Sequence, residues 1–225
     1  MAISRVYGPT AISEGTTAID LNGADYVTIT ISAVHNGFAT GDAVPTTLTY
    51  AGAGFVQLYV GTDGNSTTNA LSIYGLKAPA SGSNNLIIDV PGSSYDGGPV
   101  IVVEGFTGCV QSDTASDVRR TAVQDNSFGS SVSLAYSGLT AGDWIMYRLN
   151  DYSDTAHAAT GVAVEDLEAT NNSFTVWCGS FTATGTSHTG GANGGSFLWG
   201  AAIALIPAAA AAATLSNPGI CISIG

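Results

Sequence analysis

The stretch that decides the fold is YVTITIS (26–32), in which apolar and polar side chains alternate strictly. Its aliphatic residues stand at positions 27, 29 and 31, and its hydroxyl residues stand at 28, 30 and 32. A period of two predicts a β-strand whose two faces differ in polarity. The same alternation recurs in SFTVWCGSF (173–181).

Working outward from these two runs, the chain contains further short segments rich in β-branched and aromatic residues, which favour strands. They are TTLTY (46–50), FVQLYV (55–60), ALSIYGL (70–76), NLIIDV (85–90), VIVVEGF (100–106), SVSLAY (131–136), WIMYRL (144–149) and FLWGAAIALI (197–206). VIVV and AAIALI lack alternation, which predicts central strands that are buried on both faces.

Turns are predicted where glycine, asparagine and serine cluster, because these residues accept the backbone angles of tight turns. The clusters are GTDGNS (61–66), PGSSYDGG (91–98) and SHTGGANGG (187–195). No window longer than ten residues has a helical apolar stripe. We therefore expect an all-β protein, a two-sheet antiparallel sandwich of the jelly-roll kind. Residues 1–40 would form an arm and the first strands, 41–207 the sandwich, and 208–225 an alanine-rich connector and a second arm.

The charge balance excludes some classes of partner. The chain has 17 acidic and 5 basic side chains, a net charge of −12, and charged residues make up only 10% of it. Such a chain repels nucleic acid and anionic membrane surfaces. The apolar run 197–213 is interrupted by Pro207 and has no flanking Lys or Arg, which argues against a membrane span. No signal peptide is recognisable at the N-terminus, so synthesis in a cytoplasm is expected.

The last part of the sequence is uncharged, because no Asp, Glu, Lys or Arg follows Glu168. It closes with PGICISIG (218–225), in which Ile220, Ile222 and Ile224 alternate with smaller residues. An unpaired strand of this composition invites aggregation. We expect it to dock into its own sheet or against a neighbouring subunit.

No pattern of a known catalytic centre is present: the sequence lacks GxSxG, HExxH and a GxxxxGK phosphate loop. An enzyme and a bound cofactor are therefore not expected. The three cysteines, Cys109, Cys178 and Cys221, have no CxxC spacing and are expected to be reduced.

Three groups of polar or aromatic residues are candidate sites. Asp151, Asp154 and His157 could bind a divalent ion such as Ca²⁺, although a solvated loop after the strand at 144–149 explains them better. Glu165, Asp166 and Glu168 fit a solvated strand edge better than a pair of glycosidase carboxylates. Trp144, Tyr147 and Tyr152 could stack on a glycan, with burial in the core as the alternative.

Five segments resemble a β-sandwich domain found in phage virion proteins and in some bacterial surface proteins. The segments are TTLTYAG (46–52), ALSIYGLKAPASGSNNLIIDV (70–90), VIVVEGFTGCVQSD (100–113), GDWIMYRL (142–149) and FLWGAAIALIP (197–207). The resemblance lies in the pattern of strands and turns and supplies no catalytic residues.

This resemblance implies a virion structural protein, a decoration or cement protein on the outer capsid surface that bridges capsid subunits. It implies the major capsid protein and the chain itself as partners, with a homotrimer as the assembled state. The alternative is a glycan-binding adhesion module of a tail fibre, spike or head fibre, whose ligand would be a host-surface glycan.

Overall fold

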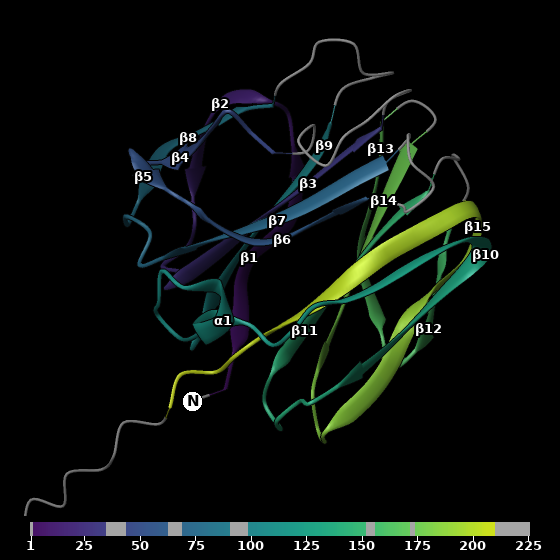
Figure 1. Cartoon of the computed structure of the whole chain (residues 1–225). Helices are drawn as coiled ribbons and strands as arrows, with labels where there is room; N and C mark the ends of the chain where they lie inside the picture. The colour runs from purple at the N-terminus through teal and green to yellow at the C-terminus, as the bar shows by residue number, and fades with distance from the viewer. Residues whose placement is uncertain are drawn as a thin grey trace, which may run out of the picture.

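The computed structural model describes residues 2–34, 44–62, 69–90, 99–151, 156–171 and 174–209. Within these ranges the regular secondary structure is almost entirely antiparallel strands, with one short helix, α1 (Ala115–Val118) (Figure 1). The all-β prediction is confirmed. The strands form three sheets rather than one pair of sheets.

The first half of the chain forms two of these sheets. The central sheet has the order β1 (Ser4–Ile12), β9 (Val100–Thr107), β3 (Tyr26–Val34), β7 (Asn69–Lys77) and β6 (Val56–Thr62). The outer sheet has the order β2 (Gly15–Asp20), β8 (Ser83–Asp89), β4 (Thr47–Tyr50) and β5 (Ala53–Gly54). Successive strands cross repeatedly between the two sheets, which is compatible with the predicted jelly roll. The segment before residue 40 supplies β1, β2 and β3, so it is an integral part of both sheets.

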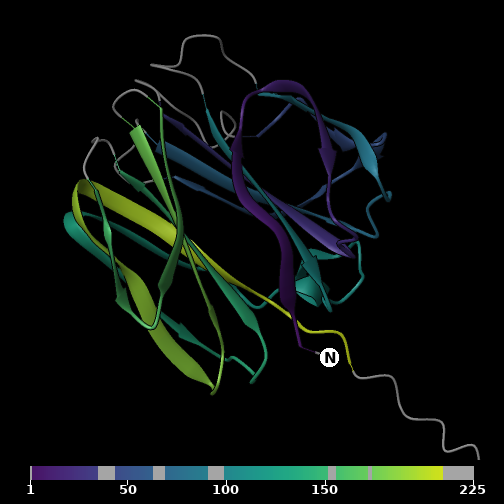
Figure 2. The ribbon, with the colours of Figure 1, turned by 180° about the vertical axis from the view of Figure 1, so that it is seen from behind.

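The second half forms the C-terminal sheet. Its order is β10 (Val123–Ser137), β15 (Ser187–Leu205), β11 (Trp144–Asp151), β14 (Phe174–Thr182) and β13 (Val164–Asn171). A further strand, β12 (Ala158–Gly161), pairs with the first half of β15. β10 and β15 both bend, so that the second half of β10 and the first half of β15 fold over the rest of the sheet (Figures 1 and 2).

The central sheet is covered on both faces. Val27, Ile29 and Ile31 of β3 pack against the outer sheet, as their shared apolar face predicts. The opposite, hydroxyl-bearing face of β3 is also buried, because it turns toward the C-terminal sheet; Thr28 and Thr30 are each 1% exposed. The predicted central strands are confirmed, since 100–103 in β9 and 201–205 in β15 are buried throughout.

The prediction of a turn at residues 187–195 is wrong, because this segment forms the first half of β15. Its small residues allow strands to approach closely. A Cβ on Gly191 would lie 2.0 Å from the carbonyl oxygen of Val132 on β10, and one on Gly190 would lie 2.7 Å from the ring of Tyr147. The glycines here serve close packing within a sheet, a role that the same residue type also takes in strands.

The apolar run weighed as a membrane span is likewise strand as far as Leu205. Among the described residues, no helix has the length and apolar character needed to cross a membrane. Cys109 and Cys178 are free and buried, as expected, and burial raises the pKa of the Cys178 thiol to about 12. Cys221 and Ile220, Ile222 and Ile224 lie outside the described residues.

The Gly191→Ala substitution is expected to destabilise the protein by about 1–3 kcal/mol, because the added methyl group collides with the Val132 carbonyl and forces β10 and β15 apart. Gly185→Ala is the matched control, since a Cβ there has no neighbour within 4 Å. Urea unfolding of the two variants measures the difference. Equal stabilities would contradict the close approach of the two strands.

Candidate functional site

A fully buried charged group, Arg148, lies in the middle of β11. Its side chain is 0% exposed and points from the C-terminal sheet toward the central sheet. It forms an ion pair with Glu104 of β9, whose side chain is 1% exposed, and donates a hydrogen bond of 3.2 Å to Thr30 Oγ1. It also donates to the backbone carbonyls of Tyr147 and Gly179. The hydroxyl face of β3 thus supports a buried charge pair.

This pair continues to the N-terminal strand through Arg5. One guanidinium nitrogen of Arg5 lies 3.2 Å from Glu104, and another lies 2.6 Å from Asp166 of β13. The guanidinium also lies over the Trp144 ring, 5.7 Å from its centroid. Burial favours the neutral form of Asp166, but the hydrogen bond and charge of Arg5 outweigh it and lower the pKa of this carboxyl. Four alternating charges therefore connect β1, β9, β11 and β13.

Two charged groups of this network stand out in the sequence as isolated charges within apolar strands, Glu104 in VIVVEGF and Arg148 in WIMYRL. A lone charge in a central strand must find a partner, because an unpaired buried charge is very costly. The sequence therefore indicates that both charges are paired in the fold. It does not identify the partner of either charge.

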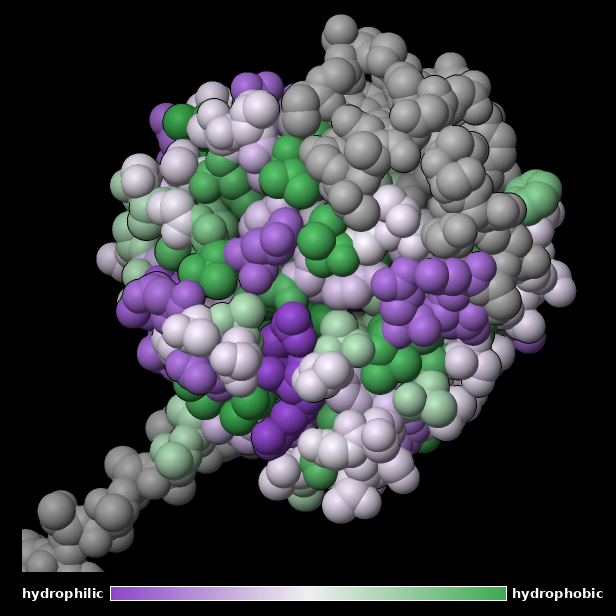
Figure 3. Space-filling model, viewed as in Figure 1, coloured by the Kyte–Doolittle hydropathy of each residue, from purple (hydrophilic) through white to green (hydrophobic). Residues whose placement is uncertain are grey.

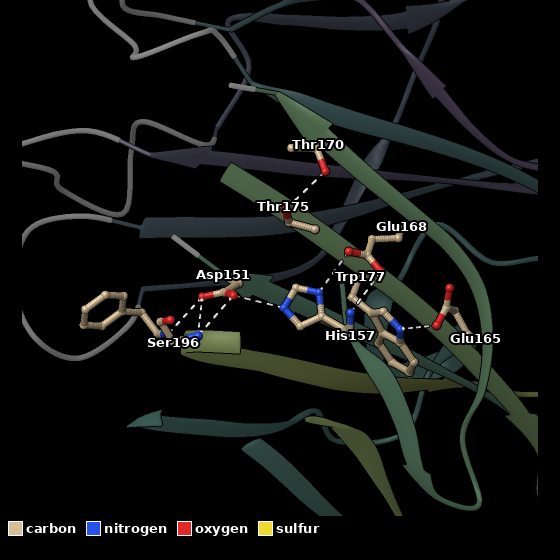
Figure 4. A network of polar contacts seen from close by, with 9 residues as sticks. Asp151, His157, Glu165, Glu168, Thr170, Thr175, Trp177 and Ser196 are labelled. Atoms are coloured by element: carbon tan, nitrogen blue, oxygen red, sulfur yellow. Dashed lines mark hydrogen bonds and ion pairs between the residues drawn. The ribbon is translucent and has the colours of Figure 1, made fainter. Parts of the chain in front are cut away.

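A second polar cluster surrounds His157 (Figure 4). Its Nε2 lies 3.0 Å from Asp151 and its Nδ1 lies 3.1 Å from Glu168. The backbone N–H of His157 also donates to Glu168. Asp151 accepts hydrogen bonds from the backbone N–H groups of Ser196 and Phe197, between the two halves of β15. The cluster ties the end of β11, the approach to β12, and β13 to the middle of β15.

Burial disfavours the charged form of His157, but the hydrogen bonds and negative charges of Asp151 and Glu168 outweigh it. The pKa of His157 is therefore raised above its ordinary value. With a carboxylate on each ring nitrogen, the imidazolium form donates at both positions. The geometry is that of a histidine held between two carboxylates.

The structure brings together two of the three residues weighed as metal ligands, Asp151 and His157, while Asp154 lies outside the described residues. In the described part of the chain, no group of three or more His, Cys, Asp or Glu side chains is arranged to hold a metal ion. Glu168 was missed as the second partner of His157. It comes from β13, and only the folding of that strand places it there.

The three carboxylates of β13 have separate partners. Glu165 accepts a hydrogen bond of 3.2 Å from Trp177 Nε1, Asp166 pairs with Arg5, and Glu168 binds His157. β13 is an edge strand, as expected for this acidic segment.

The aromatic residues weighed as a glycan platform do not share a surface. Trp144 faces the central sheet, where its ring packs against Phe106 at a centroid distance of 5.8 Å. Tyr147 faces the opposite side of β11 and is 0% exposed within the core of the C-terminal sheet. Their odd spacing along one strand separates them. Tyr152 lies outside the described residues.

An open cleft of about 720 Å³ lies where the turn between β1 and β2 meets the beginning of β9 and the end of β13. Ser13, Glu14 and Thr17 supply polar groups to it, and Glu14 also accepts a hydrogen bond from the Val90 N–H. Among the described residues, those that line it include no aromatic side chain, basic group or histidine. The described lining of the cleft therefore offers hydroxyl groups and one carboxylate.

All five basic side chains are engaged within the chain. Besides Arg5 and Arg148, Lys77 pairs with Asp113 at 2.5 Å, Arg120 pairs with Asp143 at 2.8 Å, and Arg119 donates to the carbonyls of Leu58 and Arg120. The carboxylates that remain give the molecule its acidic character.

No family model matches the sequence, and no curated protein or solved structure matches it either.

Glu104→Gln is expected to cost about 3–5 kcal/mol of stability, because it leaves the Arg148 guanidinium buried without a counter-charge. The double variant Arg148→Met with Glu104→Leu removes both charges and should recover most of that loss. Denaturant unfolding measures both. If the double variant is at least as unstable as Glu104→Gln alone, the unpaired charge of Arg148 is not the cause of the lost stability.

The stability contributed by the His157 clamp should depend on pH. Because the folded-state pKa is raised, this contribution is fully present below the unfolded pKa of about 6.5 and is lost as the pH rises through the folded pKa. Unfolding measured from pH 5.5 to 9 should show this decline in the wild type and not in His157→Gln. His188→Gln is the control and should keep the decline, since His188 binds the Thr184 and Gly185 N–H groups instead. A decline that persists in His157→Gln would assign it to another group.

Proposed function

We propose that this protein is a virion structural protein, a non-enzymatic decoration or cement protein that lies on the outer capsid surface and works by assembly. The observation that carries the proposal is the distribution of charge. Every Lys and Arg side chain is bound to a carboxylate or carbonyl group of the same chain, and no Asp, Glu, Lys or Arg follows Glu168.

The excess of 17 acidic over 5 basic side chains, with each of the five already paired within the chain, gives the protein a net acidic charge that opposes contact with packaged nucleic acid. Such a surface is suited to the outside of a particle rather than to a layer that lines it. The proposal of an outer position rests on this argument and on the resemblance of residues 40–207 to a phage β-sandwich domain.

The uncharged part of the chain supports an assembly role. Residues 174–205 of this part form β14 and β15 and are largely buried. The remaining residues 210–225 contain the alternating sequence GICISIG, which has the pattern of a strand with one apolar face. Contacts between subunits, in a trimer and with the capsid protein, are proposed to come from this segment.

The buried networks also fit a protein that must be rigid. The ion pairs of Arg148 and Arg5 join the two halves of the chain, and the His157 clamp holds the bend of β15. A glycan-binding role is less well supported, because Trp144 and Tyr147 face opposite sides of β11.

The purified chain should sediment with capsids of the source particle that lack it, and electron microscopy of the decorated shell should trace it on the outer surface. In solution it should self-associate, with a trimer as the expected mass by gel filtration and light scattering. Deletion of residues 210–225 should abolish this self-association and leave the fold intact by circular dichroism. A chain that is monomeric at all concentrations and ignores capsids would contradict the proposed function.

A further inference from the structure

The edges of the three sheets are protected to very different degrees. An unprotected edge strand presents unpaired N–H and C=O groups to any other strand, so proteins cover or disrupt such edges. A comparison of the edge strands therefore indicates where a further strand could be added.

The edges of the central sheet are disrupted or covered. β1 contains Pro9 and two register irregularities, and it carries Arg5. β6 has an irregularity next to Gln57, and its carbonyls accept hydrogen bonds from side chains: Arg119 binds the Leu58 carbonyl and Gln124 binds the Thr62 carbonyl at 2.8 Å.

The outer sheet has short edges. β5 has two residues, and β2 has six, with Glu14 just before it and Asp20 at its end. In the C-terminal sheet, β13 is an edge that contains three carboxylates and a register irregularity between Glu165 and Leu167. Each of these strands carries at least one feature that opposes pairing.

The second half of β10 lacks all of these features. From Ser131 to Ser137 it pairs with β15 in a continuous register, and its sequence SVSLAYS has no charge, proline or glycine. None of the described strands pairs with its outer side. In Figure 3 the lower part of the molecule, where this half of β10 lies in Figure 1, is mostly pale. The pale colour marks residues of intermediate hydropathy.

The two faces of this strand differ in a way that specifies its partner. Ser131, Ser133, Ala135 and Ser137 are exposed, whereas Val132, Leu134 and Tyr136 are each 1% exposed in the core of the C-terminal sheet. An added strand would therefore need apolar residues at every second position and small residues between them. It would also need to lack charge, because a charge beside this apolar row would be buried.

Residues 219–225, GICISIG, meet each of these requirements. Ile220, Ile222 and Ile224 would continue the row of Val132, Leu134 and Tyr136, and Cys221 and Ser223 would continue the exposed row. Residues 210–225 follow the described chain and, at about 3.3 Å per residue, span up to about 50 Å when extended. That reach is sufficient to cross to a neighbouring molecule.

We propose that residues 219–225 of one copy add as a strand to the outer edge of β10, residues 131–137, of a second copy. This inference rests on the proposed function and specifies the contact through which the subunits assemble. It is a β-augmentation, in which main-chain hydrogen bonds hold the segment and the alternating side chains select it.

The native Cys221 allows a direct test, because Cys109 and Cys178 are buried and unavailable. Ser131→Cys, Ser133→Cys and Ala135→Cys place a thiol on the exposed row of β10 in three registers. Under mild oxidation of the full chain, at least one variant should form covalent dimers and larger species on a non-reducing gel, at tenfold or more the yield of the control. Thr16→Cys, at an exposed position on the edge strand β2, is that control, and addition of Cys221→Ser should remove the bands.

The outcomes separate this inference from the function on which it rests. If deletion of 210–225 abolishes self-association but no β10 variant forms cross-linked dimers, the proposed edge is wrong while assembly through the segment stands. If the thiols are oxidised but the protein still runs as a monomer on the non-reducing gel, residues 219–225 pair with β10 of their own chain. That result would overturn the proposed pairing between two copies. If the full chain never self-associates but still binds capsids, the exchange between copies is wrong while the proposed function stands. If it neither self-associates nor binds capsids, both proposals fail.

Discussion

The buried ion pair between Arg148 and Glu104 is the interaction on which the rest of the structure depends. It joins β11 of the second half of the chain to β9 of the first, at a place where both side chains are removed from water. A buried pair of this kind adds little stability over an apolar contact, but it penalises every arrangement that leaves one charge unpaired. The two halves are therefore fixed in one relative position, and neither can bury its facing surface correctly without the other.

The His157 clamp imposes a second constraint of the same physical kind, within the C-terminal sheet. Asp151 binds both the imidazole ring and the backbone N–H groups at the middle of β15, so the acid that orients the histidine also fixes the bend of the strand. Close approach at Gly190 and Gly191 brings the folded-over half of β15 against Tyr147 and β10. Polar clamping and glycine contacts thus jointly enclose the core formed around Trp177.

The sequence allowed prediction of the strands whose pattern is local. Alternation identified β3, and the uninterrupted apolar runs identified β9 and the second half of β15 as central. It failed at residues 187–195, where glycines that permit close packing resemble glycines that permit turns. The pairing of His157 with Glu168 could not be predicted, since it depends on which strand lies beside β12. The separation of Trp144 from Tyr147 could have been predicted, because positions three apart on a strand face opposite sides.

The cost of burying an unpaired charge bears on both the charged interior and the uncharged final segment. Charges placed inside a fold specify one arrangement of its own strands, because each must meet its partner. A strand that must pair with another molecule has the opposite requirement, since a charge on it would have to be desolvated at each encounter. Residues 131–137 and 219–225 contain no charge, whereas the edges at β1 and β13 carry Arg5 and three carboxylates. The lack of charge on residues 131–137 and 219–225 therefore suits them to the pairing proposed between copies.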